Sequence, residues 1–399
     1  MSTAVPPLPE IKPPVGLNQA NLTVAKESGY FVGVLLVSLL VWLVLALSLI
    51  GLFYAALFGV ILWISHGLLT AYLRAEAVRV GPEQLPQLEA TFREVCGRLG
   101  VSKVPALYVL QSGGLLNAFA TRFAGRDFVV VYSDMLEALG PDSNEMRFIL
   151  GHEIGHIQSR HILKQVLLAP GLFFPLLGPA YRRAWETSCD RYGAFAAQDV
   201  SASVRAMLVL SGGREYGRRL NPAAFAGQHA DERGFFVSLH EVTSTYPTLS
   251  RRVVELQALA DGRIVRHPPR NPLAYLVGLL MPGGTVGSGG PVMAMMFVVV
   301  FVGMMAAMAI PAFQKVREAS QVKMCINNQR MLAAALEQYR LEHGETADTW
   351  DQVTGPEGYL AAMPICPAQG TYDATLAEDD TYDVRCSVET HDPAQVPER

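Results

Sequence analysis

The 399-residue sequence has few charged side chains and no excess of positive charge. Charged residues make up 17% of the chain, and 32 Lys and Arg against 36 Asp and Glu give a net charge of −4. Proteins that bind nucleic acid neutralise phosphates with a basic surface, which this balance does not supply. The composition therefore excludes nucleic acid from the expected partners.

Cysteine is also scarce. Five cysteines scattered over the chain are too few for a small fold held together by disulfides. By contrast, half of the residues are hydrophobic and the mean hydropathy is +0.24, which is high for an ordinary cytosolic protein. The length predicts two or three folded units. These features together favour a membrane-anchored protein with soluble parts.

The longest stretch without charge predicts the anchor. Residues 28–73 contain no Asp, Glu, Lys or Arg, and as a helix they would be about 69 Å long, roughly twice the hydrocarbon core of a bilayer. We therefore expect two transmembrane helices within residues 30–73, after a flexible Pro-rich tail over residues 1–29. The alternative is a buried helical hairpin of a soluble protein.

A third transmembrane helix is expected over residues 291–313, after a linker over residues 261–290 that ends in a Gly-rich run. Residues 162–181 are also apolar but contain three prolines, which break a single spanning helix. That segment is interpreted as dipping into the membrane or lining a cleft.

These spans predict a multi-pass protein of the bacterial inner membrane, in contact with the lipid bilayer. Basic residues flanking the first two spans, such as Arg74 and Arg79, favour the cytoplasm for residues 74–260. A single further crossing then places the C-terminal region outside the cytoplasm, although the positive flank at Lys315 and Arg317 favours the opposite orientation.

The block between the anchors has the pattern of a helix-rich α+β domain. Helical periodicity appears over residues 83–99, 143–161 and 182–210. Short apolar runs at residues 107–110 and 128–132 are typical of strands. Beyond the third span, a helical pattern over residues 314–344 precedes a stretch rich in Gly, Pro and Asp with short strand candidates.

One motif in this block indicates chemistry. His152, Glu153 and His156 have the order H-E-x-x-H. A spacing of four residues puts both imidazoles on one face of a helix, where two nitrogens can bind one zinc ion. Glu153 lies beside them, where it can take a proton from a metal-activated water. The motif therefore predicts a zinc centre with Glu153 as general base.

A catalytic zinc site needs a third protein ligand and an open position. Glu186 and Asp190 lie one helical turn apart in a later helical pattern. Glu186 would complete a His, His, Glu site, and Asp190 would accept a hydrogen bond from a ligand histidine. The alternative is a solvated acidic pair on a helix surface. His161 falls about 140° round the helix from the metal face and is expected at the surface, while Cys189 is expected to be a buried neutral thiol.

These motifs resemble those of the membrane-bound zinc metalloendopeptidases of the HtpX and CAAX-prenyl-protease type, over residues 74–260. Asn117, Ala118 and Phe119 resemble a family motif that lies along the substrate cleft. Arg252 corresponds to an Arg that closes a His-Pro segment, and Tyr246 occupies the position where the family commonly has His. A tyrosine hydroxyl can donate the same hydrogen bond to an oxyanion.

The resemblance implies a gluzincin, an endopeptidase with one Zn²⁺ per chain bound by His152, His156 and Glu186. It also implies protein or peptide substrates, such as membrane or misfolded proteins, and a role in protein quality control. The competing hypothesis is a non-proteolytic membrane adaptor that displays its C-terminal region.

Residues 314–399 resemble the helix and small α+β head of type IV pilins and pseudopilins, although a processing site is lacking. The resemblance implies a module for protein partners rather than a filament subunit. Cys366 and Cys386 lie near the two ends of this head. Outside the cytoplasm they are expected to form a disulfide, and in the cytosol they would be free thiols or part of a metal site.

Overall fold

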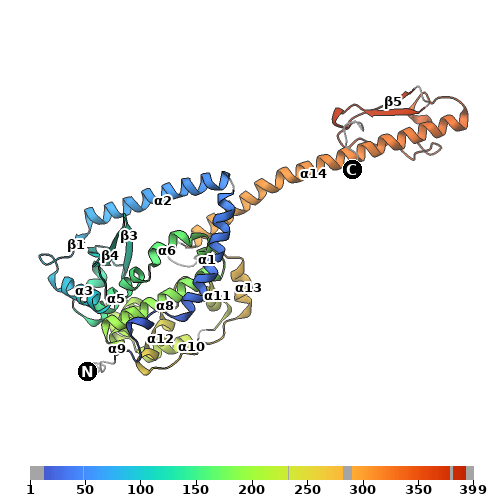
Figure 1. Ribbon diagram of the computed structural model, residues 1–399. Coiled ribbons are helices and arrows are strands. Elements are labelled where there is room, and N and C mark those ends of the chain that lie inside the picture. The colour runs from blue at the N-terminus through green and yellow to red at the C-terminus, as the bar shows by residue number, and fades with distance from the viewer. Residues whose placement is uncertain (1–12, 48, 232, 282–289, 378–380, 392–399) are drawn as a thin grey trace. The chain divides into compact units, whose positions relative to one another are not determined.

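A computed structural model describes residues 13–47, 49–231, 233–281, 290–377 and 381–391. The chain divides into two compact units, Met1–Met295 and Met296–Arg399, and each has its own hydrophobic core. The first unit is a helix-rich α+β fold, as predicted (Figure 1).

The helices of the first unit surround a small sheet. They are α1 (Ala25–Ala46), α2 (Leu49–Glu76), α3 (Pro86–Arg98), α4 (Ser133–Leu139), α5 (Asn144–Gln158), α6 (His161–Leu167), α7 (Ala169–Leu172), α8 (Leu177–Ala197), α9 (Val200–Tyr216), α10 (Pro222–Asp231), α11 (Phe235–Thr243), α12 (Leu249–Asp261) and α13 (Pro272–Leu279). The predicted helix over 182–210 is two helices, because Asp199 caps a new one at Val200.

The sheet has four strands in the order β1-β2-β4-β3. They are β1 (Val78–Arg79), β2 (Ala106–Leu110), β3 (Ala118–Phe123) and β4 (Arg126–Tyr132). β2 and β4 are parallel and confirm the two predicted strands, whereas β1 and β3 are antiparallel to their neighbours. The sequence reasoning did not assign β3, which forms one edge of the sheet.

Both faces of the sheet are covered (Figure 1). Val129 and Val131 point into the main core with α3, α5 and α9. Val130, between them, points the other way and packs with Leu73 near the end of α2. A strand buried on both faces needs a continuous apolar run, which explains the valines of β4. The sheet thus fixes α5 on one side and the end of α2 on the other.

The N-terminal segment is packed rather than flexible, which corrects the predicted tail over the residues that are described. Leu22 is buried in the main core, and the backbone N–H of Val15 donates a hydrogen bond to Leu259. Glu27 is also buried and binds His161 and Ser188. Buried partners therefore hold this segment, and residues 1–12 lie outside the described residues.

Among the described residues, α1 is the helix that is long and apolar enough to cross a membrane, with a mean hydropathy of 2.5 and 11% of its apolar window buried. Its neighbour α2 is helical to Glu76, and its last turns pack on the sheet through Leu73. Length and composition alone do not distinguish a span from other apolar helices, so the number of spans stays a prediction.

The proline-containing segment after α5 is broken as predicted. It forms α6 and the single turn α7, and α8 begins at Leu177. This segment lies against α1, where the Ser38 hydroxyl donates to the carbonyl of Leu168 and accepts from the N–H of Gly171. A Cβ on Gly171 would lie 2.3 Å from the carbonyl oxygen of Val34, so the close contact with α1 requires glycine.

The second unit is built on the C-terminal part of α14 (Gly290–His343). β5 (Tyr372–Leu376) and β6 (Tyr382–Cys386) form an antiparallel pair, and their side chains Tyr372 and Val384 share a small core with Leu332 of α14. The predicted helix and strands of this region are therefore present. Within the predicted third span over residues 291–313, the side chains of residues 291–310 and 312 lie outside those that are described.

Cys366 and Cys386 are free thiols in the structure, with their sulfurs 3.7 Å apart. A disulfide bond is about 2.05 Å long, so the structure differs from the predicted pairing. Two further side chains, Cys325 and His391, lie beside the same sulfurs, which is the arrangement expected under the alternative of a metal site.

Candidate metal centre

α5 and α8 cross at close range because glycines lie where the two helices meet. A Cβ on Gly151 would lie 2.5 Å from the Cβ of Ala196, and a Cβ on Gly193 would lie 2.6 Å from the carbonyl oxygen of Phe148. Side chains at these positions would push the helices apart. The close crossing allows side chains of α5 to meet Glu186 of α8.

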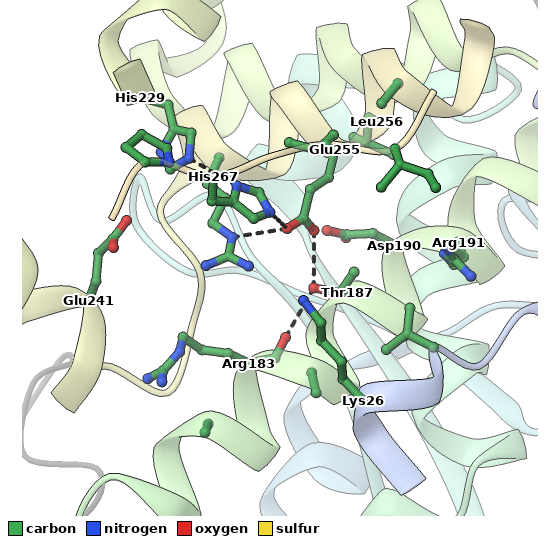
Figure 2. A pocket seen from close by; sticks show the side chains of 18 of the residues that line it. Lys26, Arg183, Thr187, Asp190, Arg191, His229, Glu241, Glu255, Leu256 and His267 are labelled. Carbon is green, nitrogen blue, oxygen red and sulfur yellow. Dashed lines mark hydrogen bonds and ion pairs between the residues drawn. The ribbon is translucent and has the colours of Figure 1, made fainter. Parts of the chain in front are cut away.

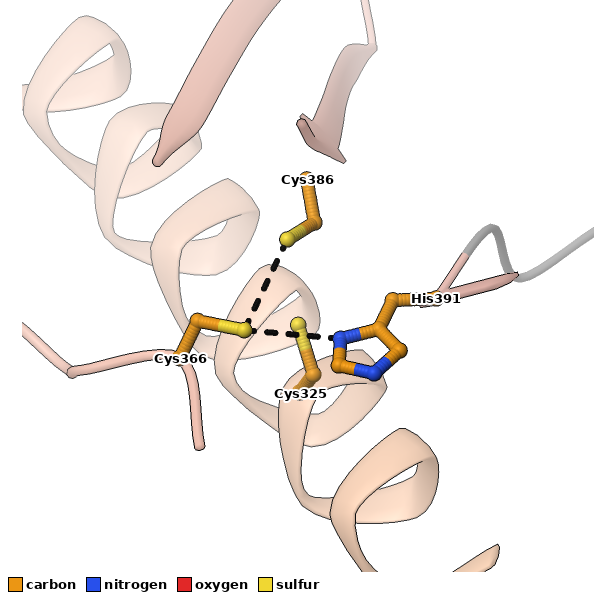
Figure 3. A group of neighbouring side chains, drawn as sticks. All are labelled: Cys325, Cys366, Cys386 and His391. Atoms are coloured by element: carbon orange, nitrogen blue, oxygen red, sulfur yellow. Dashed lines mark hydrogen bonds between the residues drawn. The ribbon is translucent and has the colours of Figure 1, made fainter. Parts of the chain in front are cut away.

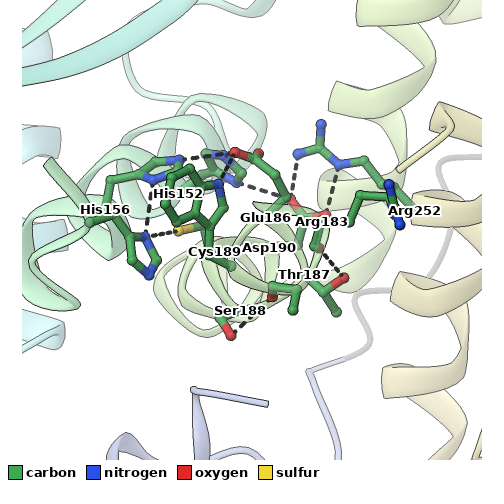
Figure 4. Close-up of polar contacts among 12 residues, drawn as sticks. His152, His156, Arg183, Glu186, Thr187, Ser188, Cys189, Asp190 and Arg252 are labelled. Carbon is green, nitrogen blue, oxygen red and sulfur yellow. Dashed lines mark hydrogen bonds and ion pairs between the residues drawn. The ribbon is translucent and has the colours of Figure 1, made fainter. Parts of the chain in front are cut away.

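His152, His156 and Glu186 converge at this crossing (Figure 4). Their ligating atoms all lie within 4.8 Å of one another. The Nε2 atom of His152 is 3.3 Å from Glu186 Oε2, and the Nε2 atom of His156 is 3.6 Å from Glu186 Oε1. The structure therefore brings together the three side chains that the sequence motifs predicted to bind one ion.

The donor atoms fit a divalent metal. Glu186 is only 2% exposed, and its Oε2 atom has no hydrogen-bond partner although it lies near His152. Its Oε1 atom accepts a hydrogen bond from the indole N–H of Trp185, at 3.0 Å. A buried carboxylate oxygen without a hydrogen bond is costly unless something else satisfies it. Two imidazole nitrogens and this oxygen form a donor set that zinc accepts.

His152 is held from behind by Asp190 and Arg252 (Figure 4). The Nδ1 atom of His152 is 2.9 Å from Asp190 Oδ1. Arg252 donates to both oxygens of Asp190, at 2.8 and 2.6 Å. This bidentate pair fixes the carboxylate, which in turn fixes the imidazole with Nε2 towards the ligand cluster. Arg252, 8% exposed, is thus a positioning residue in this geometry.

His156 has a separate support, which corrects the expectation that His161 lies at the surface. α5 ends at Gln158, Arg160 adopts φ 56°, and His161 begins the next helix, so the angle of one continuous helix does not apply. His161 is 0% exposed, with its Nδ1 atom 3.2 Å from His156 Nδ1 and its Nε2 atom 2.9 Å from Glu27 Oε1. A His-His-Glu chain therefore orients His156.

The sequence reasoning missed Trp185, which donates to Glu186, and Glu27, which binds the His161 side chain behind His156. Glu27 begins the apolar helix α1 and also accepts a hydrogen bond from Ser188 of α8, at 2.5 Å. A carboxylate at the start of an apolar segment, with no cation at helical spacing able to neutralise it, is the signal that pointed to a distant partner. Trp185 gave no signal, because its role depends on its indole meeting the adjacent Glu186.

Burial and nearby charges set opposite protonation states in the cluster. Burial lowers the pKa of His156 to about 3, so its imidazole is neutral and can act as a ligand. Burial alone would raise the pKa of Glu186, but the two histidines outweigh it and lower that pKa to about 2. Burial would likewise lower the pKa of His152, but Asp190 and Glu186 raise it to about 10. The carboxylates of Asp190 and Glu186 therefore stabilise a positive charge placed between the two histidines.

Glu153 lies next to the ligands but does not belong to the ligand cluster. Burial raises the pKa of its carboxyl to about 7, and the backbone of Ala120 in β3 donates a hydrogen bond to it. A carboxyl with a pKa near neutrality can both accept and donate a proton. Its contact with β3 also shows that the unassigned edge strand reaches the centre.

The other predicted residues lie around this core. Asn117 is exposed just before β3, and Ala118 and Phe119 begin that strand. Tyr246 is 58% exposed, and the carboxylate of Glu186 is the main cause that raises its pKa, so its hydroxyl stays protonated at neutral pH. Cys189 is buried, burial raises its pKa, and its sulfur lies 3.7 Å from the Nδ1 atom of His161, so the neutral thiol stays a prediction.

A cavity of about 690 Å³ lies on another side of α8 (Figure 2). Asp190 is the residue it shares with the groups described above. Charged side chains that line the cavity pair with one another: Glu255 binds Arg251 at 2.9 Å and His267 at 3.0 Å. The His152, His156 and Glu186 side chains do not line it. This cavity is therefore separate from the point where the ligand atoms converge.

Comparison with known proteins agrees with this geometry. Residues 82–177 match the model of Peptidase family M48. The plastoglobule-localized metallopeptidase 48 of Arabidopsis thaliana is 30% identical over 169 residues, which cover 38% of this chain and 48% of that protein. A protease HtpX homolog of Sulfurihydrogenibium sp. (strain YO3AOP1) is 36% identical over 115 residues, which cover 27% of this chain and 36% of that protein.

The chain spans less than half the length of these curated relatives. No solved structure matches it. The family match includes His152, Glu153 and His156 and ends before Glu186. Over the matched residues the chain is similar to the M48 peptidases, which supports a metallopeptidase domain of the HtpX type.

Proposed function

We propose that the protein is a zinc-dependent endopeptidase of the gluzincin type. The observation that carries the proposal is the convergence of His152, His156 and Glu186, with a buried Glu186 Oε2 atom that has no hydrogen bond and lies 3.3 Å from His152 Nε2, next to a Glu153 that is left out of the ligand cluster. Three ligands leave one position of a tetrahedral ion open, which is the pattern of catalytic rather than structural zinc.

When bound, zinc would lower the pKa of a water molecule towards 7 and polarise a carbonyl group. Glu153 would take the proton of that water and later deliver it to the leaving amine, which its pKa near 7 permits in both directions. Tyr246 would donate a hydrogen bond to the oxyanion, because its hydroxyl is protonated. Asp190 and His161 would keep the two imidazoles in the orientation that ligation requires.

The edge strand β3 would hold the substrate. It pairs with β4 on one side, and the backbone of its Ala120 reaches Glu153. An extended peptide can add to such an edge through main-chain hydrogen bonds. The start of the cleft would then be lined by Asn117, Ala118 and Phe119. Binding there would depend on main-chain hydrogen bonds of the substrate rather than on the charge of its side chains.

Proteolysis by three samples tests the mechanism: zinc-loaded wild type, the chelated protein and the Glu153→Gln variant. Cleavage of a casein-type substrate should be lost in the second sample, return on adding zinc, and fall about a thousandfold in the third with zinc still bound. Glu83→Gln, an exposed Glu→Gln change in the same unit, is the matched control. Equal activity in all samples would reject the mechanism and favour the non-proteolytic adaptor.

The proposed setting is the bacterial inner membrane, with α1 and α2 as anchor and membrane or misfolded proteins as substrates. The apolar helix α1 supports the anchor. In the second unit, a helix packed on a two-stranded sheet supports a pilin-like head that would bind protein partners. Reporters fused after residue 399 and within residues 74–260 would test whether the two parts lie on opposite sides of the membrane.

A further inference from the structure

The second unit contains a cluster of four side chains that ligate soft metals (Figure 3). Cys325 comes from α14, Cys366 from the loop before β5, Cys386 from the end of β6, and His391 from the short helix Glu389–His391. One ligating atom of each lies within 4.8 Å of those of the others. Cys325, Cys366 and His391 are buried and Cys386 is half-buried. Four elements of the unit therefore present three sulfurs and one nitrogen to one point.

Two of the distances between the ligand atoms fit a tetrahedral zinc site. Zinc–sulfur bonds of 2.3 Å and zinc–nitrogen bonds of 2.0–2.1 Å, at tetrahedral angles, place ligand sulfurs about 3.8 Å apart and a sulfur and a nitrogen about 3.6 Å apart. The sulfurs of Cys366 and Cys386 are 3.7 Å apart, and Cys366 Sγ is 3.4 Å from His391 Nδ1. The distance of 3.7 Å between the two sulfurs is far too long for a disulfide bond.

Hydrogen-bond donors face all three sulfurs. Backbone N–H groups of Ala368 and Gly370 donate to Cys366, and that of Val388 donates to Cys386. The amide of Gln329 donates to Cys325, at 3.4 Å, and to the carbonyl of His391, at 2.9 Å. Such donors orient ligands and stabilise negative charge on sulfur.

One glycine also fits this arrangement. A Cβ on Gly370 would lie 2.5 Å from the sulfur of Cys386, so glycine is needed where the loop passes the cluster. The preceding Gln369 adopts φ 59°, which turns the chain so that the N–H of Gly370 faces Cys366.

We propose that Cys325, Cys366, Cys386 and His391 bind one structural Zn²⁺. Thiolates and imidazole suit zinc and disfavour Mg²⁺ and Ca²⁺. On binding, each of the three thiols releases its proton to solvent and the imidazole binds in its neutral form. Four protein ligands leave no position for water, so this site would be structural rather than catalytic. It would tie α14, the loop, the hairpin and the C-terminal turn of a unit whose core is small.

Cobalt substitution of the full-length protein tests the site. Thiolate ligands give Co²⁺ an intense charge-transfer band in the near ultraviolet, and a His, His, Glu site does not. The wild type should bind two zinc ions per chain and show the band after exchange with cobalt. Cys366→Ser and His391→Ala should each lose the band and one metal equivalent, whereas Cys96→Ser, a buried thiol of the first unit, should keep both.

Alkylation of the wild type gives a second readout that does not depend on folded variants. Cys325, Cys366 and Cys386 should be protected while zinc is bound and should react after chelation. Glu186→Gln should keep the band and one zinc ion, so failure of the protease proposal and failure of this one are distinguishable.

Three results would overturn the inference: no charge-transfer band in the cobalt-exchanged wild type, an equal band in Cys366→Ser, or a disulfide joining Cys366 and Cys386 in freshly purified protein. Iron in place of zinc at native stoichiometry would overturn the metal assignment.

Discussion

The two clusters proposed here to bind zinc differ in the number and kind of their ligands and in their surroundings. His152, His156 and Glu186 offer nitrogen and oxygen from two crossing helices, with Glu153 beside them. Cys325, Cys366, Cys386 and His391 offer mainly sulfur from four separate segments, with no carboxylate in the group. Three ligands with a neighbouring base suit hydrolysis, and four ligands without one suit structural support. The number of ligands and the presence of a free base thus separate two roles that one metal can serve.

The supports behind the ligands also differ. In the first cluster, side-chain pairs orient the histidines: Asp190 with Arg252 behind His152, and His161 with Glu27 behind His156. In the second, backbone N–H groups and Gln329 face the sulfurs. Imidazole needs its second nitrogen fixed, whereas thiolate needs donors that share its charge. Each kind of ligand is therefore matched by its own kind of neighbour.

The largest expected effect comes from removing a ligand of the first cluster alone. Glu186→Gln replaces a charged ligand with a neutral amide in a buried site, so zinc at that cluster and proteolysis should fall below detection. Metal analysis and casein cleavage check this, with Glu83→Gln as control. Full activity in Glu186→Gln would show that the first cluster is not the catalytic zinc site.

Asp190→Asn should have the next largest effect. The amide cannot hold both the N–H of His152 and the two donors of Arg252, so zinc affinity should fall about 10- to 100-fold. Competition with a chelator of known affinity measures the change. The exposed Asp142→Asn on the same unit should leave the affinity unaltered.

Gly151→Ala would test whether the first cluster depends on the helix crossing. The added Cβ would meet Ala196 at 2.5 Å, so α5 and α8 should separate and the unit should lose about 1–3 kcal/mol of unfolding free energy. The temperature of thermal unfolding and the proteolytic activity should both fall. Gly97→Ala, also helical but facing open space, should be neutral or slightly stabilising. Equal stability of the two variants would contradict the role given to the crossing.

Glu27→Gln should have the smallest effect, because it acts through His161 on His156. The neutral amide still accepts a hydrogen bond from Nε2 of His161 but polarises the two linked imidazoles less. The zinc affinity should therefore fall by several-fold up to about tenfold. Chelator competition again measures it. An effect as large as that of Glu186→Gln would mean that Glu27 is itself a ligand.

Local patterns predicted the centre of the first cluster, and long-range contacts determined the rest. The spacing of His152 and His156, and of Glu186 and Asp190, is set within one or two helical turns, so sequence alone placed each pair on one face. His161 was misplaced because Arg160 ends the helix with a positive φ, which spacing does not reveal. β3 was missed because its pairing with β4 determines the strand.

The second cluster was only partly accessible to sequence reasoning. Cys366 and Cys386 stood out as a pair, but Cys325 lies in α14 and His391 close to the end of the chain. Nothing in their spacing joins them, since a hairpin and a long helix must first pack. Ligands gathered by tertiary packing are therefore the ones that a motif search omits.

X-ray absorption at the zinc edge of the full-length Cys325→Ser variant tests the central claim most directly, because only the first cluster should remain loaded. The account predicts one zinc ion with nitrogen and oxygen neighbours alone, at about 2.0–2.2 Å. Sulfur neighbours at about 2.3 Å, or a protein without zinc, would contradict it.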